Sequence, residues 1–194
     1  MQIAFFDFDG TITTKDTFLE FIKYTHGKLQ FYLGFLIVSP YLILYKLGVI
    51  PNWKAKEKVI TYFYKGDTYT SLKQIGKQFS LHKIPQLIRP AALERIKWHQ
   101  AEGHKVLIIS ASVDIWLEAW CNSLNVELIA THLEVIQGKV TGKLGCVNCY
   151  GAEKVNRIKK AITLTDYEII HAYGDSRGDK EMLELSHKRY YKYF

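Results

Sequence analysis

Three short apolar runs, each followed directly by polar residues, limit the possible folds of this chain more than any other feature. The runs cover residues 2–6, 105–109 and 168–173, and the polar clusters after them are Asp7 to Thr11, Ser110 to Ser112 and Gly174 to Ser176. Brief apolar runs that end at turn residues are typical of buried parallel strands. In open α/β sheets, ligands bind beyond the carboxyl ends of such strands. We therefore expect the three clusters to meet at one site.

Stretches with helical patterning alternate with these runs, which favours an α/β fold with a doubly wound parallel sheet. We expect helices at roughly 114–124, 153–162 and 179–185, a further strand at 127–131 and a β-hairpin at 134–144. Residues 13–90 interrupt the alternation, because their apolar residues recur at helical spacing. The sequence thus predicts a Rossmann-like core of residues 1–12 and 91–194 that carries an inserted α-helical cap of residues 13–90.

The positive charge of the chain is concentrated in the predicted cap. Residues 13–89 contain twelve basic and four acidic side chains, a net charge of +8, whereas the rest of the chain has a net charge of −1. A solvated helix face, an anionic lipid or phosphorylated substrate, and a nucleic acid would each explain such a block. The chain has three cysteines and opens on an acidic motif in place of a signal peptide, so we expect a cytoplasmic protein. Its seven histidines show no metal-ligand spacing and are expected to be surface or core residues.

The motif Asp7-Phe8-Asp9-Gly10-Thr11 places two carboxylates two residues apart at the end of a predicted strand. Two crowded carboxylates repel each other unless a cation lies between them. Mg²⁺ prefers hard oxygen ligands and completes its shell with water and substrate phosphate. An ordinary Asp-Gly turn would explain Asp9 and Gly10 but leaves Asp7 without a role.

The other polar clusters supply groups that a phosphate or a metal needs. Ser110 offers a hydroxyl, and the residues beside it, such as Ala111, offer backbone N–H groups; Ser112 is interpreted as a helix N-cap. Lys154 offers a point charge for a phosphate, although an exposed helical lysine is the simpler interpretation. Asp175 offers a further metal ligand, and Asp179 an acid behind it that also caps a helix.

Taken together and in this order, the four motifs resemble those of the haloacid dehalogenase-like hydrolase superfamily. The helical insert directly after the first motif resembles the phosphoserine-phosphatase-like branch. The resemblance implies that Asp7 is the nucleophile and a Mg²⁺ ligand, and that Asp9 is the acid and base whose backbone carbonyl also binds the metal. It further implies that Ser110 and Lys154 hold phosphate oxygens, that Asp175 is a metal ligand, and that Asp179 orients the metal shell and Lys154.

The cap bears on the substrate. In phosphoserine phosphatases the cap supplies a Glu for the substrate amine and an Arg for its carboxylate; here Asp16 stands at the acidic position, and no Arg occurs between Met1 and Ile88. The region from Asp7 to Gly48 also resembles phosphatidylglycerophosphatase C-like members of the same branch, which have an apolar cap segment at this place. The resemblance implies an anionic lipid phosphate such as phosphatidylglycerophosphate as the favoured substrate.

The segment 29–45 has no charged residue and includes Gly34 and Pro40. Two short cap helices with a buried seam, or an interfacial hairpin that dips into a membrane, would both fit this composition. In the second case the outward face should carry Phe31, Phe35, Leu42 and Tyr45.

Three functions compete at this stage. The first is a Mg²⁺-dependent phosphomonoesterase that acts on a lipid headgroup, with peripheral contact between its cap and the inner face of a membrane. The second is a phosphatase of a soluble metabolite such as phosphoserine. The third is a non-catalytic protein that binds a membrane surface or a nucleic acid, which the intact set of Asp7, Asp9, Lys154 and Asp175 disfavours.

Overall fold

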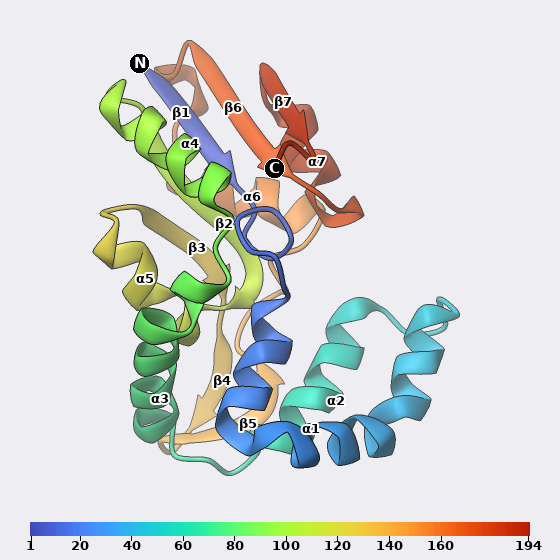
Figure 1. The fold of residues 1–194 in the computed structure, drawn as a ribbon. Coiled ribbons are helices and arrows are strands. Elements are labelled where there is room, and N and C mark those ends of the chain that lie inside the picture. The colour runs from blue at the N-terminus through green and yellow to red at the C-terminus, as the bar shows by residue number, and fades with distance from the viewer.

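A five-stranded parallel sheet forms the centre of the computed structural model, which describes residues 1–194 (Figure 1). The strand order is β3-β2-β1-β6-β7, with parallel pairing throughout. The strands are β1 (Gln2–Phe6), β2 (Lys105–Val113), β3 (Glu127–Thr131), β6 (Ile169–Gly174) and β7 (Lys188–Tyr191). This arrangement confirms the predicted α/β fold class.

Helices cover both faces of the sheet, because alternate side chains of the buried strands point to opposite faces. In β1, Ala4 and Phe6 belong to the larger apolar cluster together with Ile96 of α4, whereas Ile3 and Phe5 belong to the second cluster. That second cluster includes side chains of the two helices on the other face, α6 and α7. The helices of this layer system are α4 (Pro90–Ala101), α5 (Glu118–Ser123), α6 (Ala152–Ala161) and α7 (Lys180–Leu185).

Three further helices and a hairpin lie beyond the carboxyl edge of the sheet (Figure 1). They are α1 (Thr17–Lys46), α2 (Asn52–Tyr64), α3 (Tyr69–His82) and the antiparallel pair β4 (Leu133–Ile136) and β5 (Lys139–Leu144). The hairpin packs on α2, where Thr61 donates to the carbonyl of Gly142 at 3.1 Å. A Cβ at Gly142 would lie 2.5 Å from Thr61 Oγ1, so only glycine allows this approach. The division into a core and a helical cap of residues 13–90 remains our prediction.

Helix α1 bends at Gly27, whose φ of 77° and ψ of 167° are not helical. Beyond the bend it continues through Gly34 and Pro40 as one helix, so the expectation of two short helices within 29–45 is wrong. Pro40 cannot donate to the Leu36 carbonyl, and the Ser39 hydroxyl donates to it instead at 2.7 Å. Gly34 lies against α2, since a Cβ there would be 2.3 Å from the Phe63 ring.

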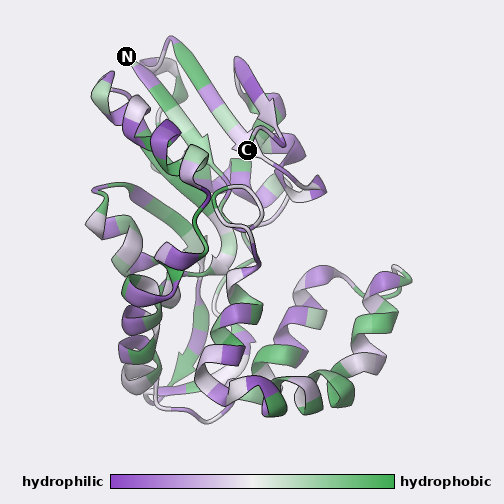
Figure 2. Ribbon diagram, viewed as in Figure 1, coloured by the Kyte–Doolittle hydropathy of each residue, from purple (hydrophilic) through white to green (hydrophobic).

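The outward face of α1 differs from the expected one. Phe31 is only 8% exposed, and Phe35 and Leu42 are partly buried against the core cluster. Tyr45, at 38% exposed, faces outward as expected, and the other exposed apolar side chains are Leu29, Tyr32, Leu33, Leu36, Ile37, Tyr41, Ile43 and Leu44. Contact with α2 sets this orientation, because the Phe35 and Phe63 ring centroids lie 6.0 Å apart. By length and composition α1 could cross a membrane, and Figure 2 shows its second half coloured largely as hydrophobic.

Candidate active site

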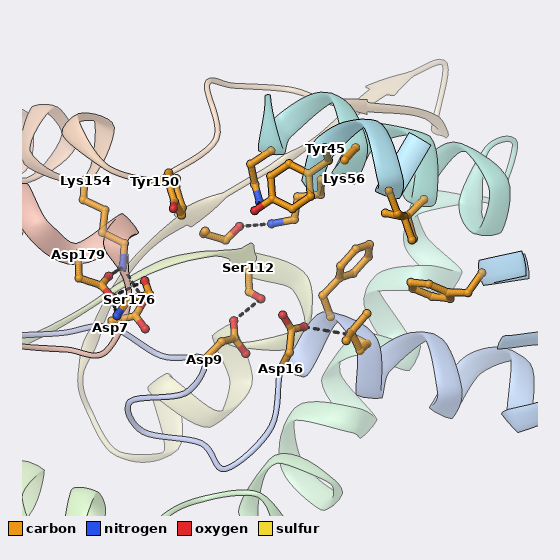
Figure 3. Close-up of a pocket in the computed structure, with 18 residues that line it drawn as sticks. Asp7, Asp9, Asp16, Tyr45, Lys56, Ser112, Tyr150, Lys154, Ser176 and Asp179 are labelled. Carbon is orange, nitrogen blue, oxygen red and sulfur yellow. Dashed lines mark hydrogen bonds and ion pairs between the residues drawn. The ribbon is translucent and has the colours of Figure 1, made fainter. Parts of the chain in front are cut away.

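The first and third polar clusters meet at the carboxyl edge of the sheet, together with the start of α6. Lys154, on the first turn of α6, donates to Asp7 at 2.5 Å and to Asp179 at 2.6 Å (Figure 3). All three side chains are buried, so the alternative of an exposed helical lysine is wrong for Lys154. A cavity of about 320 Å³ opens beside them.

The charged groups of Asp7, Lys154 and Asp179 shift one another's pKa values. Burial raises the pKa of Asp7 to about 7, although the Lys154 ammonium opposes the shift. Burial alone would lower the pKa of Lys154, but the two carboxylates outweigh it and the pKa is raised. Lys154 is therefore a fixed positive charge directly beside the Asp7 carboxylate.

Asp179 anchors the loop that carries Asp175. Its Oδ2 accepts from the backbone N–H groups of Asp175 and Ser176, at 3.2 and 2.9 Å, and from the Ser176 hydroxyl at 2.7 Å. It thus forms a capping box with Ser176 and makes no side-chain cap on α7, contrary to the expected N-cap. Burial opposes ionisation, but Lys154 and these hydrogen bonds outweigh it and lower the pKa of Asp179. Asp179 is a permanent anion whose position is fixed by its partners.

Carboxylate oxygens of Asp7, Asp175 and Asp179 lie within 4.8 Å of one another. Burial raises the pKa values of Asp7 and Asp175, as is usual for crowded buried carboxylates without a cation. Thr11 links the two residues, because its hydroxyl lies within hydrogen-bonding distance of both carboxylates. Gly10 is required here, since its φ is +88° and a Cβ would lie 2.4 Å from Asp175 Oδ2. The donor set of hard oxygens fits Mg²⁺.

The Asp9 side chain lies apart from this group. It accepts from the backbone N–H of Thr17 at 2.7 Å and from the Ser112 hydroxyl at 2.6 Å. Ser112 therefore holds Asp9 and is not the N-cap expected from the sequence. Burial and the charge of Asp16 raise the pKa of Asp9, while the two hydrogen bonds lower it. A raised pKa suits a carboxyl group that must donate a proton.

Strand β2 passes through the second polar cluster where a helix start was expected. Its register with β3 shifts between Ser110 and Val113, so the strand is irregular there. The Ser110 side chain is buried and accepts from the backbone N–H of Ser112 at 3.0 Å. Ala111 and Ser112 line the cavity, whereas Ser110 does not.

The helical layer supplies the rest of the cavity wall. Lys56 of α2 donates to the carbonyl of Ala111 at 2.6 Å, a contact that sequence reasoning missed. Asp16 lines the cavity and caps α1 by accepting from the N–H of Leu19. Seven apolar residues of the lining come from α1 and α2, namely Phe18, Leu19, Phe35, Leu42, Tyr45, Ala55 and Val59.

A model of the haloacid dehalogenase-like hydrolase family matches residues 4–184. Protein CicA of Caulobacter vibrioides (strain NA1000 / CB15N) is 34% identical over 191 residues, which cover 97% of this chain and 85% of that protein. A probable phosphatase of Mycobacterium tuberculosis (strain ATCC 25618 / H37Rv) is 29% identical over 93% of this chain and 65% of its own length.

Two solved structures show the same fold at low sequence identity. A protein of unknown function from Bordetella pertussis Tohama I has a TM-score of 0.78 at 20% identity, over 95% of this chain and 86% of that one. A phosphoserine phosphatase, solved as a phospho-aspartyl intermediate analogue, has a TM-score of 0.66 at 20% identity, over 95% and 82% of the two chains.

Proposed function

Because the chain belongs to the haloacid dehalogenase-like hydrolase family, we propose that Asp7 attacks a phosphate ester and forms an aspartyl-phosphate. The enzyme is a phosphoric monoester hydrolase. The observation that carries the proposal is the buried Asp7 carboxylate, which is held by Lys154 and lies at the same cavity as the separately positioned Asp9.

Two displacements complete the reaction. In the first, an Asp7 oxygen bonds to phosphorus, the bond to the leaving oxygen breaks, and Asp9 gives that oxygen a proton. In the second, Asp9 takes a proton from water as the water oxygen attacks phosphorus, and the bond to Asp7 breaks to release phosphate. Lys154 offsets negative charge on the phosphoryl oxygens in both steps. The backbone at Ala111, which lines the cavity, would hold the phosphate, and the buried Ser110 hydroxyl would bind it only after a change of the local backbone.

Asp7 and Asp175, with the backbone carbonyl of Asp9, would hold Mg²⁺. Asp179 orients this set through its bonds to Lys154 and to the backbone of Asp175. When bound, the metal offsets the negative charge of the phosphoryl group.

The favoured substrate is an anionic lipid phosphate such as phosphatidylglycerophosphate. Phe35, Leu42 and Tyr45 of α1 line the cavity, and other residues of the same helix form its exposed apolar face. An acyl chain could pass from the catalytic carboxylates along this wall to a membrane surface. The basic charge of residues 13–89 would favour anionic headgroups at the inner face of the membrane.

A soluble phosphomonoester such as phosphoserine is the alternative, and Asp16 at the cavity wall supports it. The absence of any arginine before Arg89 weighs against a carboxylate clamp of the bidentate kind. A non-catalytic role is disfavoured, because Asp7, Asp9, Lys154 and Asp175 are all present.

The test is hydrolysis of phosphatidylglycerophosphate in neutral detergent micelles, of phosphoserine and of p-nitrophenyl phosphate, each with Mg²⁺. We expect turnover that Asp7→Asn abolishes, because an amide is a poor nucleophile. We also expect beryllofluoride to bind at Asp7 in competition with substrate. The mechanism is wrong if Asp7→Asn retains more than about a tenth of the wild-type rate, a loss of only about 1.4 kcal/mol in transition-state stabilisation.

A further inference from the structure

Three histidines gather outside the catalytic cavity. His99 is on the last turn of α4, His104 directly precedes β2, and His171 is in β6. Each offers a ring nitrogen that lies within 4.8 Å of the other two. None of the three lines the catalytic cavity. The fold thus brings together imidazoles from separate elements, although their spacing in the sequence did not indicate a metal site.

The His171 ring has an unused lone pair. Its Nδ1 atom is buried and has no hydrogen-bond partner, and the residue is only 1% exposed. Its Nε2 atom lies 2.9 Å from the Gln2 Oε1 atom. Because a carbonyl oxygen can only accept a hydrogen bond, Nε2 carries the hydrogen, and the neutral ring keeps a lone pair on Nδ1. A buried acceptor without a partner is costly, and a bound cation would remove that cost.

His99 can present its Nδ1 atom in the same way. That atom lies 2.9 Å from His104 Nδ1, and the Nε2 atom of His99 lies 2.9 Å from the Tyr173 hydroxyl. Histidines that bind a metal usually donate their other ring N–H to an outer partner, which fixes the tautomer. Tyr173 is such a partner for His99, and Gln2 is such a partner for His171. Both buried rings are therefore oriented as metal ligands commonly are.

The geometry and chemistry of the cluster suit Zn²⁺. A tetrahedral ion with Zn–N bonds of about 2.0–2.1 Å sets its ligand nitrogens about 3.3 Å apart. The two Nδ1 atoms of His99 and His104 would need to separate slightly, and His171 would need to approach them from at most 4.8 Å. Imidazole is a good ligand for Zn²⁺, whereas Mg²⁺ prefers oxygen ligands and would stay at the catalytic carboxylates. His104 is partly exposed, which gives the ion an entry path and leaves room for a water ligand.

The charges around the cluster limit its affinity. The three ligands are neutral, and Arg95, which donates to the Tyr173 hydroxyl at 2.6 Å, places a positive charge nearby. We therefore expect weaker binding than at closed sites of four ligands that include cysteine thiolates.

We propose that His99, His104 and His171 bind a zinc ion that fastens the turn between α4 and β2 to β6. The ion would stabilise the folded chain by binding to it and not to the unfolded chain. The site is independent of the phosphatase activity, because none of its three ligands reaches the catalytic cavity.

Calorimetric titration with Zn²⁺ tests the site on the full chain, freed of metal by a chelator and carrying no polyhistidine tag. Excess Mg²⁺ keeps the catalytic carboxylates occupied. We expect a single zinc ion per chain and a rise in Tm of about 5–10 °C when free zinc is about 100-fold above its Kd. His104→Ala and His171→Leu should each weaken zinc binding by at least about 100-fold, since loss of an outer partner alone typically costs about 10- to 100-fold. The control is His82→Ala, which removes an exposed histidine of α3 and should leave binding unchanged.

Co²⁺ in place of Zn²⁺ identifies the ligands. A tetrahedral set of nitrogen ligands gives Co²⁺ a strong visible absorption, whereas six oxygen ligands give a weak one. We expect the strong absorption in the wild-type protein, its loss in His104→Ala, and its retention in Cys146→Ser. Gln2→Leu should keep the absorption but weaken zinc binding about 10-fold, because the His171 ring would lose its outer partner.

The zinc site is excluded if the wild-type protein shows no saturable zinc binding in excess Mg²⁺, or if His104→Ala binds zinc as tightly as the wild type. Loss of the absorption in Cys146→Ser, or equal weakening of zinc binding in His82→Ala, would assign the ion to other residues. If His171→Leu does not fold, His104→Ala decides, because that side chain is partly exposed and its removal leaves no buried cavity.

Discussion

The exposed apolar face of α1 gives a quantitative prediction about membrane contact. Leu36 is 70% exposed and Ile37 is 60% exposed, in a segment without charged residues. Full burial of a Leu or Ile side chain is worth about 1.5–3 kcal/mol. Insertion of these exposed portions into a bilayer interface would contribute about 1–2 kcal/mol each. Replacing both with Ser should therefore weaken vesicle binding by about 2–4 kcal/mol, or roughly 30-fold or more.

The assay is co-sedimentation with vesicles of phosphatidylglycerol and phosphatidylcholine at low salt. Ile75→Ser with Leu81→Ser is the matched control, because these two apolar side chains are partly exposed on α3 and lie outside the face of α1. Thermal unfolding should change little in the α1 double variant, whose residues are largely exposed, and more in the α3 control, whose residues are only 39% and 37% exposed. Salt should weaken binding by the wild-type protein, because the Debye length is about 8 Å at physiological ionic strength.

Two results would refute this reasoning. Wild-type protein that stays in the supernatant at low salt would show that the α1 face does not meet lipid. Equal loss of binding in the α3 control would show that any exposed apolar residue has the same effect. Either outcome would shift the proposed substrate toward a soluble phosphomonoester.

Three more predictions concern the site and the core. Asp9→Asn should slow both chemical steps about 10²-fold or more in rapid-quench kinetics and leave the fold intact, because an amide oxygen can still accept from Thr17; a wild-type rate would exclude Asp9 as the acid. EDTA should remove activity and Mg²⁺ restore it, with Ca²⁺ a poor substitute because of its larger, looser shell; full activity in chelator would contradict a metal role. Burial lowers the pKa of His99 to about 3 and of His171 to about 4, so below pH 6.5 the unfolded chain binds protons that the folded chain does not. The contribution of these two histidines to the free energy of unfolding is fully present above pH 6.5. It decreases as the pH is lowered, by about 2 kcal/mol per histidine between pH 7 and pH 5. Urea unfolding at both pH values should show a correspondingly smaller fall for His171→Gln, and an identical fall would contradict the assignment.

The strands could be predicted wherever the pattern is local. Residues 2–6 and 127–131 were expected as strands and form β1 and β3 within the same bounds. Strand β2 runs four residues past its expected end at Ile109, to Val113. The polar residues from Ser110 onward looked like a helix start, but pairing with β3 across a register shift keeps them extended. A contact with a distant strand leaves no signal in the local sequence.

The same limit separates the parts of the site that the sequence predicts from those it does not. Asp7, Asp175 and Lys154 stand in motifs whose residue types already suggest their chemistry. The bonds from Ser112 to Asp9 and from Lys56 to Ala111 join residues 103 and 55 positions apart. Neither Ser112 nor Lys56 stands in a distinctive sequence pattern. Only the folded chain therefore reveals that Ser112 positions Asp9 and that Lys56 reaches the cavity.

The prediction of which face of α1 points outward fails for a different physical reason. An amphipathic helix shows its buried face through the period of its polar residues, but residues 29–45 are uncharged on every side. The bend at Gly27 and the contact of Phe35 with Phe63 then decide which side faces outward. Phe31 and Phe35, expected outside, instead pack with the core cluster, while Leu36 and Ile37 are exposed. Substitution of Phe31 would therefore disturb helix packing and lower the free energy of unfolding. Substitution of Leu36 and Ile37 would leave the core intact and change only the binding to vesicles.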